Sequence, residues 1–324
     1  MVMLIDPARY TLNDQQIAAA VQLAGVTAGP RSSLPDASGG PDPERALKGS
    51  AALGRDGTLE EGLKVALGVL AAPTATVSLS ANVAGATEAT ESQIICGAPD
   101  GPYVGTSGPD RWDLALLPTL TDAVLYADEM LAITAGLSQV GEAPVSLGLA
   151  GLAAFAAFGD AVLNAKLQAL LARQQALQST WTTAELQDFL SAGLAHEDTR
   201  WATTAIRQAA PVPFGDGAAP LGDGLKELAR LGLVTTSGDA WTLTPAGYTR
   251  AAAFGQLVNV GAISRITVDA SGQPTVASAS VFRTVLGVWL LTWNTTSDGA
   301  RVDLEEVTAG RALELVRTLL RGDA

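Results

Sequence analysis

The segment "RWDLALLPTLTDAVLYADEMLAI" (Arg111–Ile133) leads from a strand-like stretch directly into an amphipathic helix. Its first four residues follow the pattern Arg-x-Asp-Leu, which returns as "RVDL" at residues 301–304, again just before a helical segment. In both places the motif follows segments with period-two or short apolar patterns. A four-residue match is weak by itself, but the matching order of elements indicates an internal duplication. Duplicated units of strands plus a helix usually pack around a pseudo-two-fold axis and often share one sheet.

Hydrophobic patterns around the two motifs divide the chain into three parts. In the first part we expect helices at 11–24, 57–73 and 119–133, a Pro- and Gly-rich loop at 28–46, and strands at 76–85, 92–101 and 112–118. The middle part is predicted to be helical at 145–178, 182–194 and 198–209. The last part has expected strands at 262–272, 275–282 and 284–294 and a helix at 307–322. We therefore expect an α/β (α+β) fold in which two quasi-symmetric half units, 1–140 and 256–324, flank a helical, winged-helix-like domain at 141–255.

The middle part ends in "LKELARLGLVTTSGDAWTLTPAG" (Leu225–Gly247), which resembles the last helix and wing of a winged-helix domain, as in MarR-type regulators. DNA recognition by such a domain needs exposed Arg, Lys, Asn or Gln on the helix and phosphate contacts from the wing. The helix offers Lys226 and Arg230, but acidic residues stand beside them, and the wing tip holds Asp239 and no base. A structural or protein-docking role is favoured, and a winged-helix DNA-binding transcriptional regulator stays as the alternative.

The overall composition points away from nucleic acid. A formal net charge of −13 argues against extensive phosphate contact, because affinity for phosphates comes largely from Lys and Arg. Hydrophobic residues make up 48% of the chain, enough for a well-filled core, whereas charged residues make up only 16%, which leaves surfaces that partners can cover. The apolar stretch 143–159 is shorter than a membrane span and is expected to be a buried helix. With no export signal in "MVMLIDPARYTLND" and a single cysteine, we expect a cytoplasmic protein without an intrachain disulfide.

The residues that catalysis requires are scarce in this chain. His196 is the single histidine and lies between two expected helices, where a solvated helix cap is the favoured interpretation. Cys96 follows two isoleucines in a strand-like run, so a buried, inert thiol is favoured over a nucleophile. With one His and one Cys, His-x-x-His and Cys-x-x-Cys sites are excluded, no Ser-His-Asp motif is recognisable, and no phosphate-binding glycine motif occurs. We therefore expect no enzyme, no cofactor and no metal site.

Tryptophans are the candidate residues for binding a partner. In "TVLGVWLLTWNTT", Trp289 and Trp293 alternate on one face of an expected strand whose other face is also apolar. Such a strand is either central in a sheet and covered on both sides, or has one face reserved for a partner. Trp112 stands at the matching place in the first motif, and Trp241 lies in the wing. These four tryptophans are the predicted partner-binding residues.

The N-terminal third contains "YTLNDQQIAAAVQLAGV" (10–26), followed by "ALGRDGTLEEGLKVALGVLAAPTATVSL" (52–79) leading into strands. This order of segments resembles the EspG family of type VII (ESX) secretion-associated chaperones of actinobacteria, over roughly 45–135 and more faintly over 262–321. The central segment 145–255 departs from the family pattern. The resemblance implies two quasi-symmetric α/β halves and a cytosolic chaperone that holds secreted helical PE–PPE substrates.

The duplication, the scarcity of catalytic groups and the Trp-bearing strand point in one direction. We expect a non-enzymatic cytoplasmic adaptor or chaperone that binds a protein partner, either a helical secretion substrate or a component of a multi-protein machine. Nucleic acid is not expected as the partner, and membrane insertion is not expected either.

Overall fold

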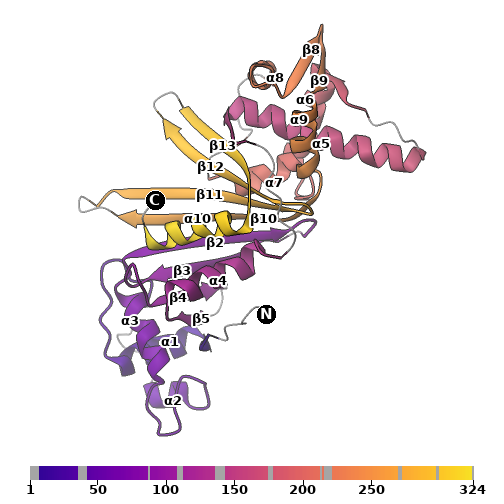
Figure 1. Cartoon of the computed structure of the whole chain (residues 1–324). Coiled ribbons are helices and arrows are strands. Elements are labelled where there is room, and N and C mark those ends of the chain that lie inside the picture. Colours follow the sequence, from indigo (N-terminus) through magenta and orange to yellow (C-terminus); the bar gives the residue numbers. More distant parts are fainter. Residues whose placement is uncertain are drawn as a thin grey trace.

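The computed structural model describes residues 7–35, 42–86, 88–107, 112–135, 143–173, 178–211, 214, 221–268, 272–296 and 299–322. The N-terminal half contributes the strands β1 (Arg9–Leu12), β2 (Ala75–Val83), β3 (Thr90–Cys96), β4 (Tyr103–Ser107) and β5 (Trp112–Leu117). The C-terminal half contributes β6 (Val145–Gly148), β10 (Leu257–Val268), β11 (Pro274–Thr284), β12 (Val288–Thr296) and β13 (Gly299–Val307). Among the described residues these strands form one antiparallel sheet in the order β1-β5-β4-β3-β2-β10-β11-β12-β13-β6 (Figure 1).

The strand order is symmetric about the pairing of β2 with β10. Going outward from that pair, each half adds its next three strands in sequence, and a short strand from earlier in the same half closes each edge. The two motifs occupy equivalent places in this arrangement. Asp113 of β5 lies opposite Thr11 of β1, and Asp303 of β13 lies opposite Ser146 of β6. The shared sheet expected from the duplication is therefore present, although Arg111 of the first motif lies outside the described residues.

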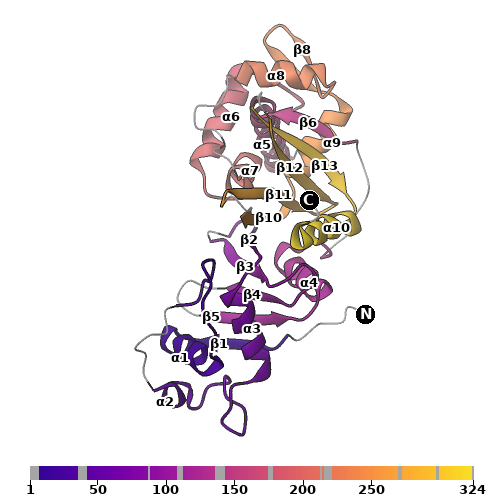
Figure 2. The same cartoon turned by 90° about the vertical axis from the view of Figure 1, so that its left-hand side faces the viewer.

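Two helices cover the centre of one face of this sheet. They are α4 (Leu120–Leu131) and α10 (Ala309–Arg321), each following its motif-bearing strand, and they pack side by side (Figure 2). Thr119 and Thr308 begin them as N-cap residues whose side chains accept a hydrogen bond from a backbone N–H three residues on. The core beneath both helices draws residues from both halves, so the halves share one hydrophobic interior.

Among the described residues, helices cover the opposite face at its two ends and leave its middle open. Three helices, α1 (Asp14–Ala24), α2 (Pro43–Leu47) and α3 (Glu61–Ala71), build a core with the β5 end of the sheet that includes Val104 and Leu114. At the β13 end, a helical region forms a separate core with Trp289 and Leu304. The middle of this face, formed by β3, β2 and β10, lies between the two helical groups.

The helical region fills the gap between β6 and β10 in sequence. It consists of α5 (Leu149–Ala172), β7 (Thr180–Thr182), α6 (Thr183–Ala195), α7 (Ala202–Ala209), α8 (Leu221–Arg230), β8 (Val234–Ser237), β9 (Ala240–Leu243) and α9 (Pro245–Phe254). The three short strands form a small sheet in the order β7-β9-β8, so the helix and hairpin predicted at 225–247 are present. By length and composition α5 could cross a membrane, but 72% of the apolar window that passes this test is buried inside the protein.

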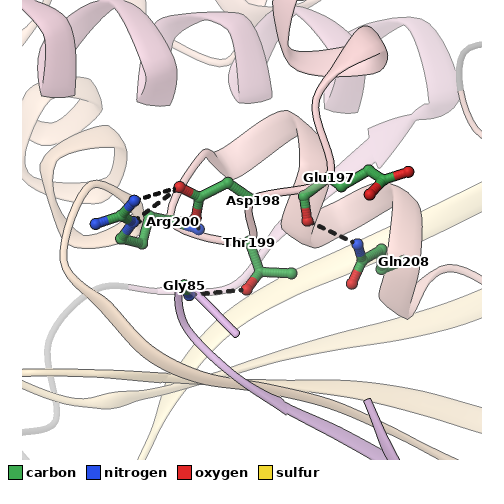
Figure 3. A network of polar contacts seen from close by, with 6 residues as sticks. All are labelled: Gly85, Glu197, Asp198, Thr199, Arg200 and Gln208. Carbon is green, nitrogen blue, oxygen red and sulfur yellow. Dashed lines mark hydrogen bonds and ion pairs between the residues drawn. The ribbon is translucent and has the colours of Figure 1, made fainter. Parts of the chain in front are cut away.

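A polar junction ties the helical region to the first half (Figure 3). The backbone N–H of Gly85, in the turn after β2, donates to Oγ1 of the buried Thr199 at 3.4 Å. Asn82 of β2 donates to Gln208 of α7 at 3.2 Å, and Gln208 in turn donates to the carbonyl of Glu197 at 3.1 Å. The tip of the β2–β3 hairpin is thus anchored to the loop between α6 and α7.

Several expectations need correction. Residues 145–148 were expected to begin a helix but form the edge strand β6, because Val145–Gly148 pairs with β13. This pairing also joins the start of the segment 141–255 to the sheet of the second half. The strand expected at 284–294 is interrupted at 285–287 by the turn between β11 and β12. The expected loop 28–46 contains the start of α2, and its residues 36–41 lie outside the described residues.

Candidate functional site

A groove of about 890 Å³ lies on the middle of the sheet, which the described helices leave open. Strand alternation explains its polar floor, because Val77 and Leu79 of β2 point to the α4/α10 side while Ser78 and Ser80 point the other way. In the neighbouring strand, Ser264 lies opposite Ser78, so two small side chains stand next to each other in the floor. Gln93 and Thr106 extend the polar floor onto β3 and β4. Small hydroxyl-bearing side chains therefore line an open part of this face, whereas helices cover its two ends.

The rim of the groove is acidic and carries one tryptophan. Asp14, at the start of α1, and Glu88 and Glu91, around the start of β3, are exposed carboxylates, and the described residues that line the groove include no Lys or Arg. The half-buried indole of Trp112 donates from Nε1 to Oδ1 of Asp14 at 3.0 Å. This bond holds an aromatic ring beside a carboxylate, an arrangement that attracts a cationic side chain by charge and by cation–π contact.

The structure does not bring the four predicted tryptophans together. Trp112 lines the groove, but Trp289 is only 1% exposed and packs at 5.7 Å from the ring of Phe254. Trp293 is half-buried and donates to Ser280 at 2.9 Å, whereas Trp241 is half-buried in the small sheet, where it donates to Thr183 at 2.9 Å. The strand-borne Trp289 is thus a core residue rather than part of an exposed docking face. The sequence pattern could not separate these cases, because both produce an apolar strand.

The two faces of β12 explain that burial. Val288 and Leu290 belong to the core under α4 and α10, while Trp289 and Leu291 belong to the core of the helical region. Of the two interpretations left open by the sequence, the central strand covered on both sides is confirmed.

The two residues with possible catalytic chemistry lie in unrelated places. Cys96 is 1% exposed beneath α10, and burial raises the pKa of its thiol to about 11, so the thiol stays protonated at neutral pH. His196 is exposed and stacks on Trp201 with ring centroids 6.0 Å apart. It ends α6 as its C-cap residue instead of beginning the next helix. Within the described ranges, no group of three or more His, Cys, Asp and Glu side chains is placed to hold a metal ion.

The helix before the wing uses much of its polar surface internally. Glu227 of α8 accepts from the backbone N–H of Gly148 at 3.0 Å and pairs with Arg301 at 3.6 Å. On its exposed side, Lys226 pairs with Asp223 at 3.1 Å. In the wing, Asp239 accepts from Thr183 at 2.8 Å. The two ion pairs compensate their charges and Asp239 adds a negative charge to the wing, which leaves these residues with no excess positive charge for phosphate contacts.

Comparison with known proteins assigns no family. No family model matches the chain, and no curated protein matches it. The resemblance to the EspG family therefore stays a prediction, and the groove with Trp112 at its rim is the structural feature that bears on function.

Proposed function

We propose that the chain is a non-enzymatic cytoplasmic adaptor or chaperone that holds a segment of a protein partner in the groove. The observation that carries this proposal is the uncovered middle of the sheet, where β2 and β10 of the two halves meet. Helices α4 and α10 cover the centre of the other face. On the groove's own face, helices cover both ends, so the exposed strip of sheet is bounded on two sides. A segment lying there contacts both halves at once.

The lining defines the chemistry of the segment. Small hydroxyl side chains such as Ser78 and Ser264 allow close approach and offer hydrogen bonds to a backbone or to polar side chains. The carboxylates of Glu88 and Glu91 and the Trp112–Asp14 pair favour a Lys or Arg on the partner. The proposed occupant is therefore a segment with small side chains and at least one basic residue.

The resemblance to EspG chaperones supports the same class of function. Two quasi-symmetric halves are what that resemblance implies, and here two halves share one sheet. On this basis, the proposed partner is a helical secretion substrate or an assembly subunit of a multi-protein machine.

Filling the groove tests the proposal. The tagged chain is purified from its native host alongside Ser78→Trp and Ser264→Trp variants, and co-purifying proteins are quantified by mass spectrometry. We expect one protein to accompany the unaltered chain and to fall by about tenfold or more with either variant, since an indole occupies the space that the segment needs.

Thr235→Trp is the matched control, because Thr235 is an exposed strand residue of the small sheet, outside the groove. This variant is expected to retain the partner, and thermal unfolding verifies that each variant folds. Recovery of a lone monomer in every case contradicts the proposal, as does a partner retained by both filled-groove variants. Co-purification of DNA, lost steeply with added salt, favours the transcriptional regulator instead.

A further inference from the structure

The two halves of helix α5 have opposite environments. Its first half is buried on all sides, from Gly151 to Val162. Beyond that point the helix projects from the body of the protein, as Figure 1 shows. The leucines of this projecting part are exposed, with Leu167 at 44%, Leu170 at 75% and Leu171 at 79%. None of them lines the groove, so this surface is separate from the site proposed above.

The exposed leucines form one face of the helix. Leu163, Leu167 and Leu170 follow the spacing i, i+4, i+7, and Leu171 lies beside them. Leu163, the first of the stripe, is half-buried where the helix leaves the body. A contiguous apolar stripe on a projecting helix is typical of a surface that a partner covers.

Charge identifies the kind of partner. Lys166 lies one turn before Leu170, and Arg173 is the C-cap residue directly after the helix, so both cations adjoin the leucine stripe. No acidic residue occurs between Leu163 and Arg173, although the whole chain carries a net charge of −13. The complement of this surface is an apolar face with carboxylates along one side.

We infer that residues 163–173 bind an amphipathic helix of another protein that carries apolar residues on one face and Glu or Asp beside them. A second copy of this chain fits less well, because pairing two such helices brings Lys166 and Arg173 close to the same cations of the partner copy. An anionic lipid surface also fits less well, since the net charge of −13 repels it and only two cations oppose that repulsion. The helix-in-groove mode of recognition uses the same i, i+4, i+7 anchors.

Two synthetic amphipathic peptides, each about five helical turns long, test this inference on the full chain. They share the same leucine positions and differ only in whether Glu or Lys flanks the leucines, and fluorescence anisotropy measures their affinity. We expect the Glu peptide to bind at least about tenfold more tightly than the Lys peptide. Leu170→Ala combined with Leu171→Ala is expected to weaken the Glu peptide by about tenfold or more.

Val285→Ala combined with Leu286→Ala is the matched control, because these residues are 56% and 50% exposed in the β11–β12 turn. This control pair is expected to leave the affinity within about twofold, and Lys166→Gln with Arg173→Gln is expected to remove the preference for Glu. Equal binding of both peptides, or no loss with the leucine variant, overturns the inference. Leucine-dependent binding to phosphatidylcholine/phosphatidylglycerol vesicles without peptide binding overturns it too. If sedimentation shows a dimer that depends on the leucines and the chain binds neither peptide, the inference is also overturned. Because the leucine stripe lies outside the groove, this inference can be overturned while the proposed function of the groove stands, and the reverse also holds.

Discussion

At the scale of single residues, Asp160 is the clearest source of pH dependence. It lies in α5, is 1% exposed, and accepts hydrogen bonds from the backbone N–H groups of Ala202 and Thr203. It therefore caps α7 from a different helix, because the N-cap residue Trp201 offers no side-chain hydrogen bond. Burial outweighs these hydrogen bonds and raises the pKa of its carboxyl to about 7.

The raised pKa predicts the direction of a stability change. Because the folded pKa lies above the unfolded value of 3.8, the stabilising contribution is fully present below about pH 4 and is lost as the pH rises through about 7. Asp160→Asn removes this titration. We expect the free energy of unfolding of the unaltered chain, relative to the variant, to fall by roughly 4 kcal/mol between pH 4 and pH 8. Urea unfolding at a series of pH values measures it.

Asp198 provides a control of opposite sign. A side-chain hydrogen bond from Arg200 holds the pKa of Asp198 below its ordinary value. The stability lost in Asp198→Asn is therefore present at neutral pH and disappears as the pH falls through the folded pKa. If Asp160→Asn shows the same sign of pH dependence as Asp198→Asn, the assignment of a raised pKa to Asp160 is wrong.

At the scale of elements, the contact between α5 and α8 depends on a glycine. A Cβ atom on Gly224 would stand 2.0 Å from the carbonyl oxygen of Ala150. Because this oxygen belongs to the backbone of α5, it can move only if the helix shifts. Gly224→Ala is expected to destabilise the protein by about 1–3 kcal/mol or more, as in other overpacked cores. Gly222, in the same helix, has nothing within 4 Å of its Cβ position. Gly222→Ala is expected to be neutral or to stabilise by up to about 1 kcal/mol. Thermal unfolding of both variants compares them, and equal melting temperatures contradict the prediction.

The elements also show what local sequence can reveal. The helix expected at 182–194 forms at Thr183–Ala195, with Thr182 and Glu185 completing a capping box, because that signal lies within four residues. The sequence does not reveal the strands β1 and β6, because each is four residues long and pairs with a strand that is distant in sequence, β5 and β13 respectively. β4 was missed because it is a five-residue strand in which Gly, Thr and Ser follow the apolar start.

The groove was beyond prediction for a related reason. Its floor comes from β2, β3, β4 and β10, and serines on those strands carry no motif that marks them as a site. Only Trp112, which stands out as an aromatic residue next to the repeated motif, was a predicted partner-binding residue that reaches the groove. Topology, rather than any local pattern, places the remaining residues together.

At the scale of the whole molecule, the two halves share one hydrophobic core, from which we expect a single folding unit. The core beneath α4 and α10 contains Leu79 from the first half and Ile263 from the second, which lie opposite each other in β2 and β10. Ile263 is fully buried, so Ile263→Ala is expected to lower the free energy of unfolding by about 2–5 kcal/mol.

The consequence of this shared core is that damage in one half reaches the other. Hydrogen exchange of Ile263→Ala, read by mass spectrometry, is expected to show lost protection in β3 and in β12 to the same extent, because opening either half exposes the core of both. Ile266→Ala is the control, since this residue of the same strand is 41% exposed and is expected to change stability by less than about 0.5 kcal/mol. Loss of protection confined to the C-terminal half contradicts a single unit. A shared response supports the view that the groove at the junction of β2 and β10 is held rigid by both halves together.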